Sequence, residues 1–463
     1  MMEATFVVVG GGIAGVSCVE TLAFLEPETS IILISESSLI KTVTNLHAIT
    51  RTLTDFDIKE TDSSYLSAKY LNITVIHESL TQIDDVEHFI LTPTKKIKYQ
   101  FLCLCMGAEP KLIPQASNCP RILGIRDTDS VEKFVENLRA AKRIAVVGNG
   151  GIASELVFKV KNVEVDWIIK DKHITATFVD PGAAEFFQPA LKKDDTAKEP
   201  ISKRMRYGEG TVSKSGAALG PDWYKDLIIS GGRDPELQSS VNLHYETEIV
   251  GVNDLKNSEF PIEVALSNGE TVACDLVISA TGVLPRDNFL TRNGLKKSED
   301  GGIQVNEFMQ TSLPDIYAAG DICSANWPLA KHWFQMKLWT QARQMGCYAA
   351  KSMSGHRRNE VVLQDFCFEM FAHSTKLFGY KVILLGLFNG QKLGTNYEIL
   401  LRMTKDKEYI KFVLEDNKLQ GAVLIGETDL EEMCENLILN QLDLSPYGDD
   451  ILDPNIDIED YFD

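Results

Sequence analysis

The sequence lacks three features, each of which would indicate a particular class of protein. No run approaches the roughly 18–20 consecutive apolar residues that a membrane-spanning helix needs, so we expect no membrane contact. The net charge of −20 opposes association with nucleic-acid phosphates, so we expect no direct nucleic-acid binding. The eight histidines are dispersed, and the sequence shows neither a metal-ligand cluster nor a Ser/His/Asp set.

The cysteines indicate the redox compartment in which the protein works. Nine are scattered along 463 residues, an odd number that does not suggest a framework of disulfides. The first apolar run, residues 6–9, is too short for a secretion signal, and no basic segment precedes it. We therefore expect reduced thiols in a cytosolic or nuclear setting. The length, with 44% hydrophobic and 24% charged residues, is typical of a globular protein of about two to four domains.

The most informative stretch comes first in the chain. Residues 6–9 predict a buried strand, glycines follow at 10, 12 and 15, and a helical pattern comes next. A G-x-G-x-x-G turn between strand and helix is typical of a dinucleotide site, because glycines permit the tight turn and the approach of a pyrophosphate. The helix N-terminus also favours phosphate. We expect the dinucleotide to contact Gly10, Gly12, Ile13, Ala14 and Gly15.

The second strand and the segment after it add two candidate contacts. Residues 31–35 predict a parallel strand, and Glu36 at its end lies 21 residues beyond Gly15. A carboxylate at that distance typically binds the ribose hydroxyls of the dinucleotide, although acids also occur at ordinary strand ends. Lys41 lies in a polar stretch that would reach the phosphates or the ring system of the cofactor from the next loop.

A second turn of the same kind begins 138 residues after the first. Ala153 replaces its third glycine, which the motif tolerates. At the end of the following strand, Asp171 would favour the free 2′-hydroxyl of NAD, whereas the flanking lysines, 170 and 172, would accommodate the 2′-phosphate of NADP; we expect both to bind. The candidate contacts are Gly148, Gly150, Gly151, Ile152, Glu155 and Asp171.

Three later strand ends also predict cofactor-facing turns. Gly107 and Ala108 follow one apolar strand pattern, and Gly282 follows another. A third strand ends at Gly320 and Asp321. Because the carboxyl ends of parallel strands form the ligand-binding edge of such sheets, we expect these turns beside the bound dinucleotides.

The rest of the chain divides by composition. Residues 185–240 are polar and locally basic, which favours a solvated insertion over a docking loop. From about residue 360 the apolar pattern alternates and a helix follows, which predicts an α+β domain with an antiparallel sheet. Residues 448–463 hold seven acids and no base and predict a flexible tail.

Taken in order, these turns resemble the two-dinucleotide flavoproteins of the pyridine nucleotide-disulfide oxidoreductase family. The resemblance spans the chain and implies an α/β fold of two Rossmann-like domains plus an interface domain, through which members often form homodimers. It implies FAD at the first turn, with Glu36, Lys41, Gly107, Ala108, Gly320 and Asp321 as further contacts, and NAD(P)H at the second, with Gly282 nearby. The implied domains are FAD-binding, 1–120 and 255–355; NAD(P)-binding, 121–254; interface, 356–447; and tail, 448–463.

Four stretches resemble one family member more closely: residues 124–130, 215–223, 338–345 and 452–463. That resemblance implies a nuclear and cytoplasmic flavoprotein that guards the catalytic subunit of the tRNA ligase complex against oxidation. The tail, with Tyr461 and Phe462 among its acids, is then a candidate for docking into a basic or metal-containing cleft on that partner. The alternative is a tail that only raises solubility.

The chain departs from the family's disulfide reductases in its cysteines. Those enzymes carry a C-x4-C pair after the first acid or a C-x-x-C pair in the NAD domain, but residues 36–51 and 121–250 contain no cysteine. Cys103 and Cys105 would share one face of a buried strand, and with Cys323 they are interpreted as apolar filling. Two hypotheses follow: an enzyme whose reduced flavin, the only redox centre, passes electrons directly to oxygen or a small acceptor, or a nucleotide-sensing binding protein with little turnover.

Overall fold

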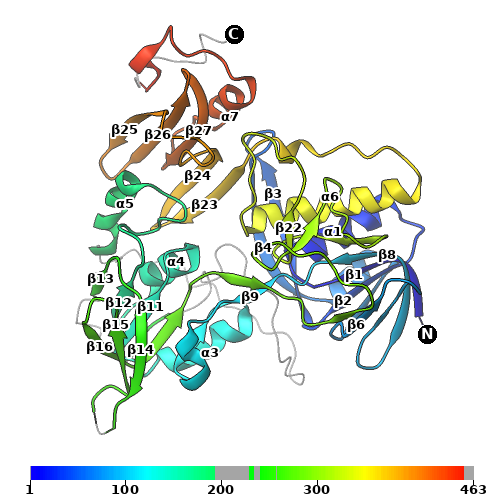
Figure 1. The fold of residues 1–463 in the computed structure, drawn as a ribbon, viewed down its shortest axis with the longest axis horizontal. Helices are drawn as coiled ribbons and strands as arrows, with labels where there is room; N and C mark the ends of the chain where they lie inside the picture. The colour runs from blue at the N-terminus through cyan, green and yellow to red at the C-terminus, as the bar shows by residue number, and fades with distance from the viewer. Residues whose placement is uncertain (1, 193–228, 234–239, 257, 453–463) are drawn as a thin grey trace.

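The computed structural model describes residues 2–192, 229–233, 240–256 and 258–452 (Figure 1). Most of the predicted insertion at 185–240 and residues 453–463 of the predicted tail lie outside these ranges. Figure 1 shows three bodies, each built around its own sheet. No helix within the described ranges is long and apolar enough to cross a membrane.

The first body is built on a sheet whose central strands are parallel. Residues 6–9 are almost completely buried between two parallel neighbours, which explains their β-branched, apolar character. Helix α1 (Ile13–Leu25) packs against α6 (Trp339–Arg357), far away in the sequence. The strands, in spatial order, are β19 (Leu290–Thr291), β6 (Gln82–Asp84), β7 (Phe89–Leu91), β8 (Lys96–Leu104), β1 (Met2–Val9), β2 (Ile31–Ser35) and β5 (Ile73–His77), with β21 (Ile316–Ala318) also beside β8.

The second body contains a five-stranded parallel sheet and a three-stranded antiparallel sheet. Helices α3 (Thr128–Leu138) and α4 (Gly151–Lys159) belong to it. The parallel order is β10 (Ile122–Gly124), β17 (Leu276–Ser279), β11 (Arg143–Val147), β12 (Glu164–Ile168) and β13 (Val241–His244), and the antiparallel order is β14 (Ile249–Asp254), β15 (Ile262–Leu266) and β16 (Thr271–Cys274).

The predicted return to the first domain at residue 255 is therefore wrong. Strand β17 lies between β10 and β11 and completes the second sheet, so residues up to 279 belong to the second body. The chain crosses between the bodies through an antiparallel pair, β9 (Ala108–Pro110) and β18 (Val283–Pro285). The apolar pattern of β17 is the same in either domain, so only strand pairing could decide its place.

The third body is an antiparallel sheet covered by α7 (Glu431–Asn440). A short 3-10 helix, Phe366–Phe368, precedes the first strand of this sheet. The sheet order is β23 (Ala372–Leu377), β24 (Tyr380–Gly386), β27 (Lys418–Ile425), β26 (Glu408–Glu415) and β25 (Glu398–Thr404).

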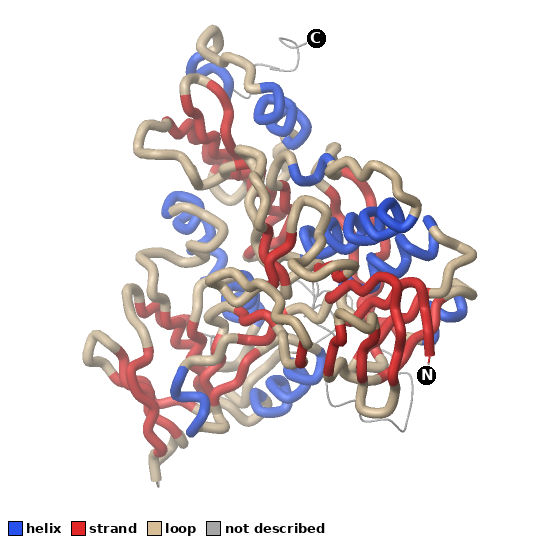
Figure 2. The backbone as a smooth tube through the Cα atoms, turned by 45° about the vertical axis from the view of Figure 1, so that its right-hand side comes forward, coloured by secondary structure: helices blue, strands red, loops and turns tan. Residues whose placement is uncertain are grey.

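Figure 2 shows the backbone of the three bodies in a second view. Two polar clusters join the third body to the other two. Glu435 of α7 accepts hydrogen bonds from the backbone amides of Arg51 and Thr52, both at 3.0 Å, at the tip of the hairpin β3 (Leu39–Ala48) and β4 (Thr54–Asp62). Asp180, before helix α5 (Pro181–Phe187), pairs with the buried ammonium of Lys411 at 2.6 Å. Buried charges held this way favour one relative placement of the bodies.

Candidate functional site

The glycines of the first turn are required for two different reasons. A Cβ at Gly10 would lie 2.2 Å from the Cys105 carbonyl oxygen, and one at Gly15 would lie 1.9 Å from the Gly10 carbonyl oxygen. Both glycines are therefore required by the packing of the chain itself, and Gly10 also has a φ of +123°. A Cβ at Gly12, by contrast, would meet no atom within 4 Å. Its missing side chain leaves open space at the start of α1.

Helix α1 leaves its N-terminal amides available to a ligand. Gly12 is its N-cap residue and supplies no side-chain cap. Ile13 and Ala14 follow in the first turn, where backbone N–H groups have no intrahelical acceptor. The helix dipole and these amides make the open space in front of Gly12 suited to a phosphate group.

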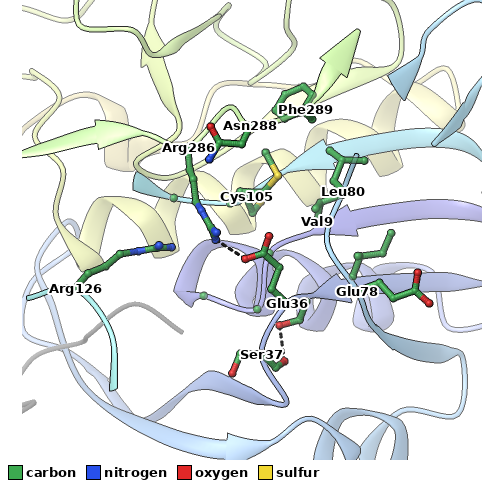
Figure 3. Close-up of a pocket in the computed structure, with 17 residues that line it drawn as sticks. Val9, Glu36, Ser37, Glu78, Leu80, Cys105, Arg126, Arg286, Asn288 and Phe289 are labelled. Carbon is green, nitrogen blue, oxygen red and sulfur yellow. Dashed lines mark hydrogen bonds and ion pairs between the residues drawn. The ribbon is translucent and has the colours of Figure 1, made fainter. Parts of the chain in front are cut away.

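A pocket opens directly onto this turn (Figure 3). Figure 3 shows Arg126 and Arg286 projecting toward it from one side and Glu36 from the other. Arg286 binds the Glu36 carboxylate at 2.7 Å. The lining residues come from six separate stretches of the chain: 9–12, 34–37, 78 and 80, 105–107, 126, and 286, 288 and 289.

Arg126 gives the pocket a positive charge that no carboxylate of the described chain neutralises directly. Its Nε is buried without a hydrogen-bond partner in the described residues. Burial, together with the nearby Arg286, lowers the pKa of its guanidinium from the ordinary value. A guanidinium with a buried, unpaired Nε favours an anion at this position, because the anion would accept the hydrogen bond that Nε lacks. No sequence pattern singles out Arg126, Arg286, Asn288 or Phe289 as a cofactor contact, although Arg126 lies in the stretch 124–130 that carries the closer family resemblance.

The second turn repeats the geometry of the first. Gly148 has a φ of +124°, and a Cβ there would lie 2.1 Å from the Ala280 carbonyl oxygen. A Cβ at Gly150 would meet no atom within 4 Å, and Gly150 caps α4 without a side-chain hydrogen bond. Gly151, Ile152 and Glu155 lie in the first turns of α4. Gly282, with a φ of +101°, follows the strand that packs against this turn.

Sequence comparison identifies the class of protein with these two turns. The profile described as pyridine nucleotide-disulphide oxidoreductase matches residues 4–198 and 236–346, and one described as the rubredoxin NAD+ reductase C-terminal domain matches residues 372–442. The chain belongs to the pyridine nucleotide-disulfide oxidoreductase family. This family consists of NAD(P)H-dependent flavoenzymes.

Relatives match over their full length. The pyridine nucleotide-disulfide oxidoreductase domain-containing protein 1 of Drosophila melanogaster is 52% identical, with 100% of this chain and 99% of that protein covered. The human protein of the same name is 47% identical, with 99% and 98% covered. A ferredoxin reductase from Rhodopseudomonas palustris has the same fold, with a TM-score of 0.71 at 17% identity over 99% of both chains. Putidaredoxin reductase in its complex with putidaredoxin gives 0.67 at 18%, covering 100% and 99%.

Membership of the family implies binding of FAD and NAD(P)H. The residues predicted to contact FAD lie at different places around the first turn. Glu36 and Gly107 line the pocket, and Ala108 begins the crossing strand β9. The predicted ribose contact of Glu36 stays a prediction, because its carboxylate is engaged with Arg286 here.

Lys41 does not lie in a polar loop, as the sequence suggested. It is buried in β3, where its ammonium binds the Glu60 carboxylate at 2.6 Å and its backbone amide donates to the Gly11 carbonyl at 3.0 Å. Glu60 also accepts a hydrogen bond from Thr128 of α3. Lys41 is thus held beside the first turn by a carboxylate, and its contact with a flavin stays a prediction.

Asp321 lies at the strand end where the sequence predicts it, after Gly320 with its φ of +81°. No described residue donates a hydrogen bond to its carboxylate. Burial raises its pKa above the ordinary value, although Lys337 and Arg126 act in the opposite direction. An unsatisfied carboxylate of this kind suits the hydroxyl groups of a ribityl chain.

Replacing Asp321 with asparagine tests this role through pH as well as affinity. A raised pKa in the folded state means that the apoprotein loses stability as pH rises from the unfolded value of 3.8 through the folded value. We expect Asp321→Asn to remove that loss and to weaken FAD binding about tenfold, the equivalent of one good hydrogen bond. Melting temperatures of the apoprotein between pH 4 and 8, and FAD titrations, measure the two effects. An apoprotein whose pH profile is unchanged would contradict the assignment.

The described structure places the nine cysteines of the chain, none of which lies at the usual family positions of a dithiol relay. All nine are free. The Sγ atoms of Cys103 and Cys105 lie 3.5 Å apart, and both residues are buried, although Cys105 lines the pocket beside the first turn. The contact with Cys103, together with burial, raises the pKa of Cys105 well above its ordinary value. Burial also raises the pKa of Cys323. Buried thiols that resist ionisation are poor nucleophiles. No group of three or more potential metal ligands occurs in the described residues.

Proposed function

We propose that this chain binds FAD at the first turn and NAD(P)H at the second, and that it transfers reducing equivalents from the nicotinamide nucleotide through the flavin to an acceptor without a dithiol relay. The observation that supports it best is the pair of turns, in each of which the middle glycine, Gly12 or Gly150, faces open space while the first glycine, Gly10 or Gly148, faces backbone. Protein packing explains the first glycines, whereas a ligand explains the middle ones.

The residues present fit FAD. The α1 amides and Arg126 would hold the pyrophosphate, Glu36 the adenosine ribose and Asp321 the ribityl hydroxyls. When bound, FAD supplies the redox chemistry by accepting a hydride from the reduced nicotinamide. The chain's own contribution is to fix the two nucleotides on adjoining sheet edges and to exclude water through the segment at Arg286, Asn288 and Phe289.

The acceptor would receive electrons directly from the flavin, because residues 36–51 and 121–250, where the family's disulfide reductases carry their cysteine pairs, contain no cysteine. We expect a double variant, Cys103→Ala with Cys105→Ala, to retain NAD(P)H turnover within about twofold of wild type. The matched control is the same double substitution to serine, which keeps the size but adds polar groups to the core. A loss of turnover greater than tenfold, with FAD still bound, would mean that these thiols take part.

We further propose that this activity protects a partner, the catalytic subunit of the tRNA ligase complex, against oxidation in the nucleus and cytoplasm. It is supported by the resemblance of the sequence stretches described above and by the acidic composition of residues 448–463. The start of this segment is anchored, since Arg402 donates to the Leu452 carbonyl at 2.7 Å. The docking of residues 453–463 on the partner can be tested by deleting them. Unchanged affinity for the partner would exclude that docking mode.

One experiment separates the enzyme from the nucleotide-sensing alternative. The purified protein is expected to show flavin absorbance, and anaerobic addition of NADH or NADPH is expected to bleach it. Sustained consumption of the nicotinamide nucleotide when an acceptor is added supports an enzyme. A single slow reduction followed by a stable reduced species supports a sensor. Protein without flavin absorbance, even after incubation with FAD, would refute both.

A further inference from the structure

The residue between the first two glycines of the second turn is unusual, because it is large, polar and buried. Asn149 is only 8% exposed. Its side chain makes three hydrogen bonds, all to the segment that follows β12. Nδ2 donates to the Asp171 carboxylate at 2.8 Å and to the His173 carbonyl at 2.8 Å, and Oδ1 accepts from the Thr175 amide at 2.5 Å.

The first turn has no side chain that makes corresponding hydrogen bonds. The corresponding position is Gly11, where a Cβ would lie 2.4 Å from the Ser35 hydroxyl oxygen, so no side chain fits there. In the second turn the segment after β12 is also held by Thr177, whose hydroxyl donates to the Asn149 carbonyl at 3.3 Å, and by the Ser154–Thr175 hydroxyl contact at 3.0 Å. The arrangement belongs to the second turn alone.

These hydrogen bonds restrict the orientation of the Asp171 carboxylate. Asn149 occupies its Oδ2, while the side chain as a whole stays exposed and Oδ1 keeps its capacity to accept a hydrogen bond. Of the two flanking lysines, Lys170 pairs with Glu248 at 3.5 Å. The strand end therefore presents an ordered negative charge, and at least one of its neighbouring ammonium groups is already partnered.

We infer that Asn149 is the positioning residue through which this chain discriminates between the two nicotinamide dinucleotides, in favour of the one without a 2′-phosphate. A fixed carboxylate at this strand end accepts hydrogen bonds from a 2′-hydroxyl and repels a 2′-phosphate. A carboxylate free to turn away does neither well. The inference rests on the proposed NAD(P)H site and specifies its ligand: binding of NAD is favoured over NADP.

The test uses the full-length, FAD-loaded protein with Asn149→Asp. This variant keeps an oxygen that can accept from the Thr175 amide but loses the Nδ2 hydrogen-bond donor. It therefore breaks the hydrogen bonds to Asp171 and to the His173 carbonyl with almost no change in side-chain volume. Dissociation constants for NAD+ and NADP+ are measured by calorimetry on the oxidised protein, and KM for NADH and NADPH by steady-state kinetics. We expect the NAD+ constant to rise about tenfold and the NADP+ constant to change less than about twofold, as the loss of one oriented, charge-assisted contact predicts.

A second variant separates the effect of the hydrogen bond between residues 149 and 171 from the effect of the negative charge at residue 171. Combining Asn149→Asp with Asp171→Asn restores a donor and an acceptor in reversed order but leaves a neutral amide at the strand end. We expect it to bind NAD+ more tightly than the single variant and NADP+ more tightly than wild type. Asn242→Asp is the matched control, because Asn242 on β13 also donates to two carboxylates of this sheet, and we expect both constants to stay at their wild-type values.

Several outcomes would overturn the inference. Wild-type protein that prefers NADP+, an Asn149→Asp variant that weakens both dinucleotides by the same factor, or one that changes neither, would each do so. FAD content and melting temperature of every variant show that the loss is not one of folding. Wild-type, flavin-loaded protein that binds neither dinucleotide would refute the proposed function itself, and this inference with it.

Discussion

Replacing Gly12 with valine is expected to abolish FAD binding while the apoprotein still folds. The backbone at Gly12 has a φ of −78°, which any L-residue adopts, and its Cβ position is open. The added side chain would therefore cause no strain in the chain but would occupy the space in front of the α1 amides. Loss of the pyrophosphate contacts is expected to weaken FAD at least about 100-fold, or roughly 2.7 kcal/mol.

The measurement is flavin content after purification, followed by FAD titration of the apoprotein. Gly150→Val is the matched control, since Gly150 has a φ of −94° and the same open surroundings in the second turn. It should keep its flavin and lose reduction by the nicotinamide nucleotide. If both variants lost FAD equally, or if Gly12→Val kept it, the assignment of FAD to the first turn would be wrong.

Arg126→Ala is expected to weaken FAD by roughly 30–100-fold, or about 2–3 kcal/mol, through the loss of a buried cation beside the pyrophosphate. The apoprotein should at the same time become no less stable, because the buried Nε has no partner in the described chain and its burial is unfavourable without an anion. Opposite effects on ligand affinity and apoprotein stability distinguish a binding residue from a structural one.

Arg139→Ala provides the control for this variant. Arg139 caps the same helix, α3, at its other end and is exposed, so its removal should leave FAD affinity unchanged. Titration with FAD and urea unfolding of the apoprotein measure the two quantities. An Arg126→Ala apoprotein that unfolds at lower urea concentration, with FAD affinity unchanged, would show that the guanidinium supports the fold instead.

The positions of both proposed cofactor sites follow from how the bodies are joined. The crossing strands β9 and β18 bring Arg286 over the first turn, and its amide donates to the Gly107 carbonyl at 3.0 Å. On the other side, the β3–β4 hairpin holds Lys41 and Glu60 near its base and meets Glu435 of α7 at its tip. The hairpin thus spans the distance from the first turn to the third body.

The two glycine turns and the antiparallel sheet could be predicted from patterns of neighbouring residues in the sequence. The strand–glycine–helix sequences at Gly10 and Gly148 predicted both turns, because strand, turn and helix are all within about 25 residues and each glycine has a local stereochemical reason. The alternating apolar pattern after residue 360 predicted the antiparallel sheet. The hydrogen bonds of Asn149 also lie within 26 residues, yet the sequence analysis passed over it as the variable position of the motif.

Other features depended on pairing between distant segments. The site of β17 in the second sheet, the Arg286–Glu36 contact and the clamp of Glu435 on residues 50–52 join residues that are 100 or more positions apart. The patterns around these residues are compatible with several partners, so no local propensity selects one.

The sequence by itself determined that this chain has two dinucleotide turns, no dithiol at the usual positions and membership of a flavoenzyme family, because these depend on short-range stereochemistry and residue identity. Only the tertiary structure decided where the domains divide, that the Nε of Arg126 is buried without a hydrogen-bond partner among the described residues, and that Lys41 is held by Glu60. Those features depend on burial and on charge compensation. Both are properties of the packed chain, set by which side chains share a low-dielectric interior.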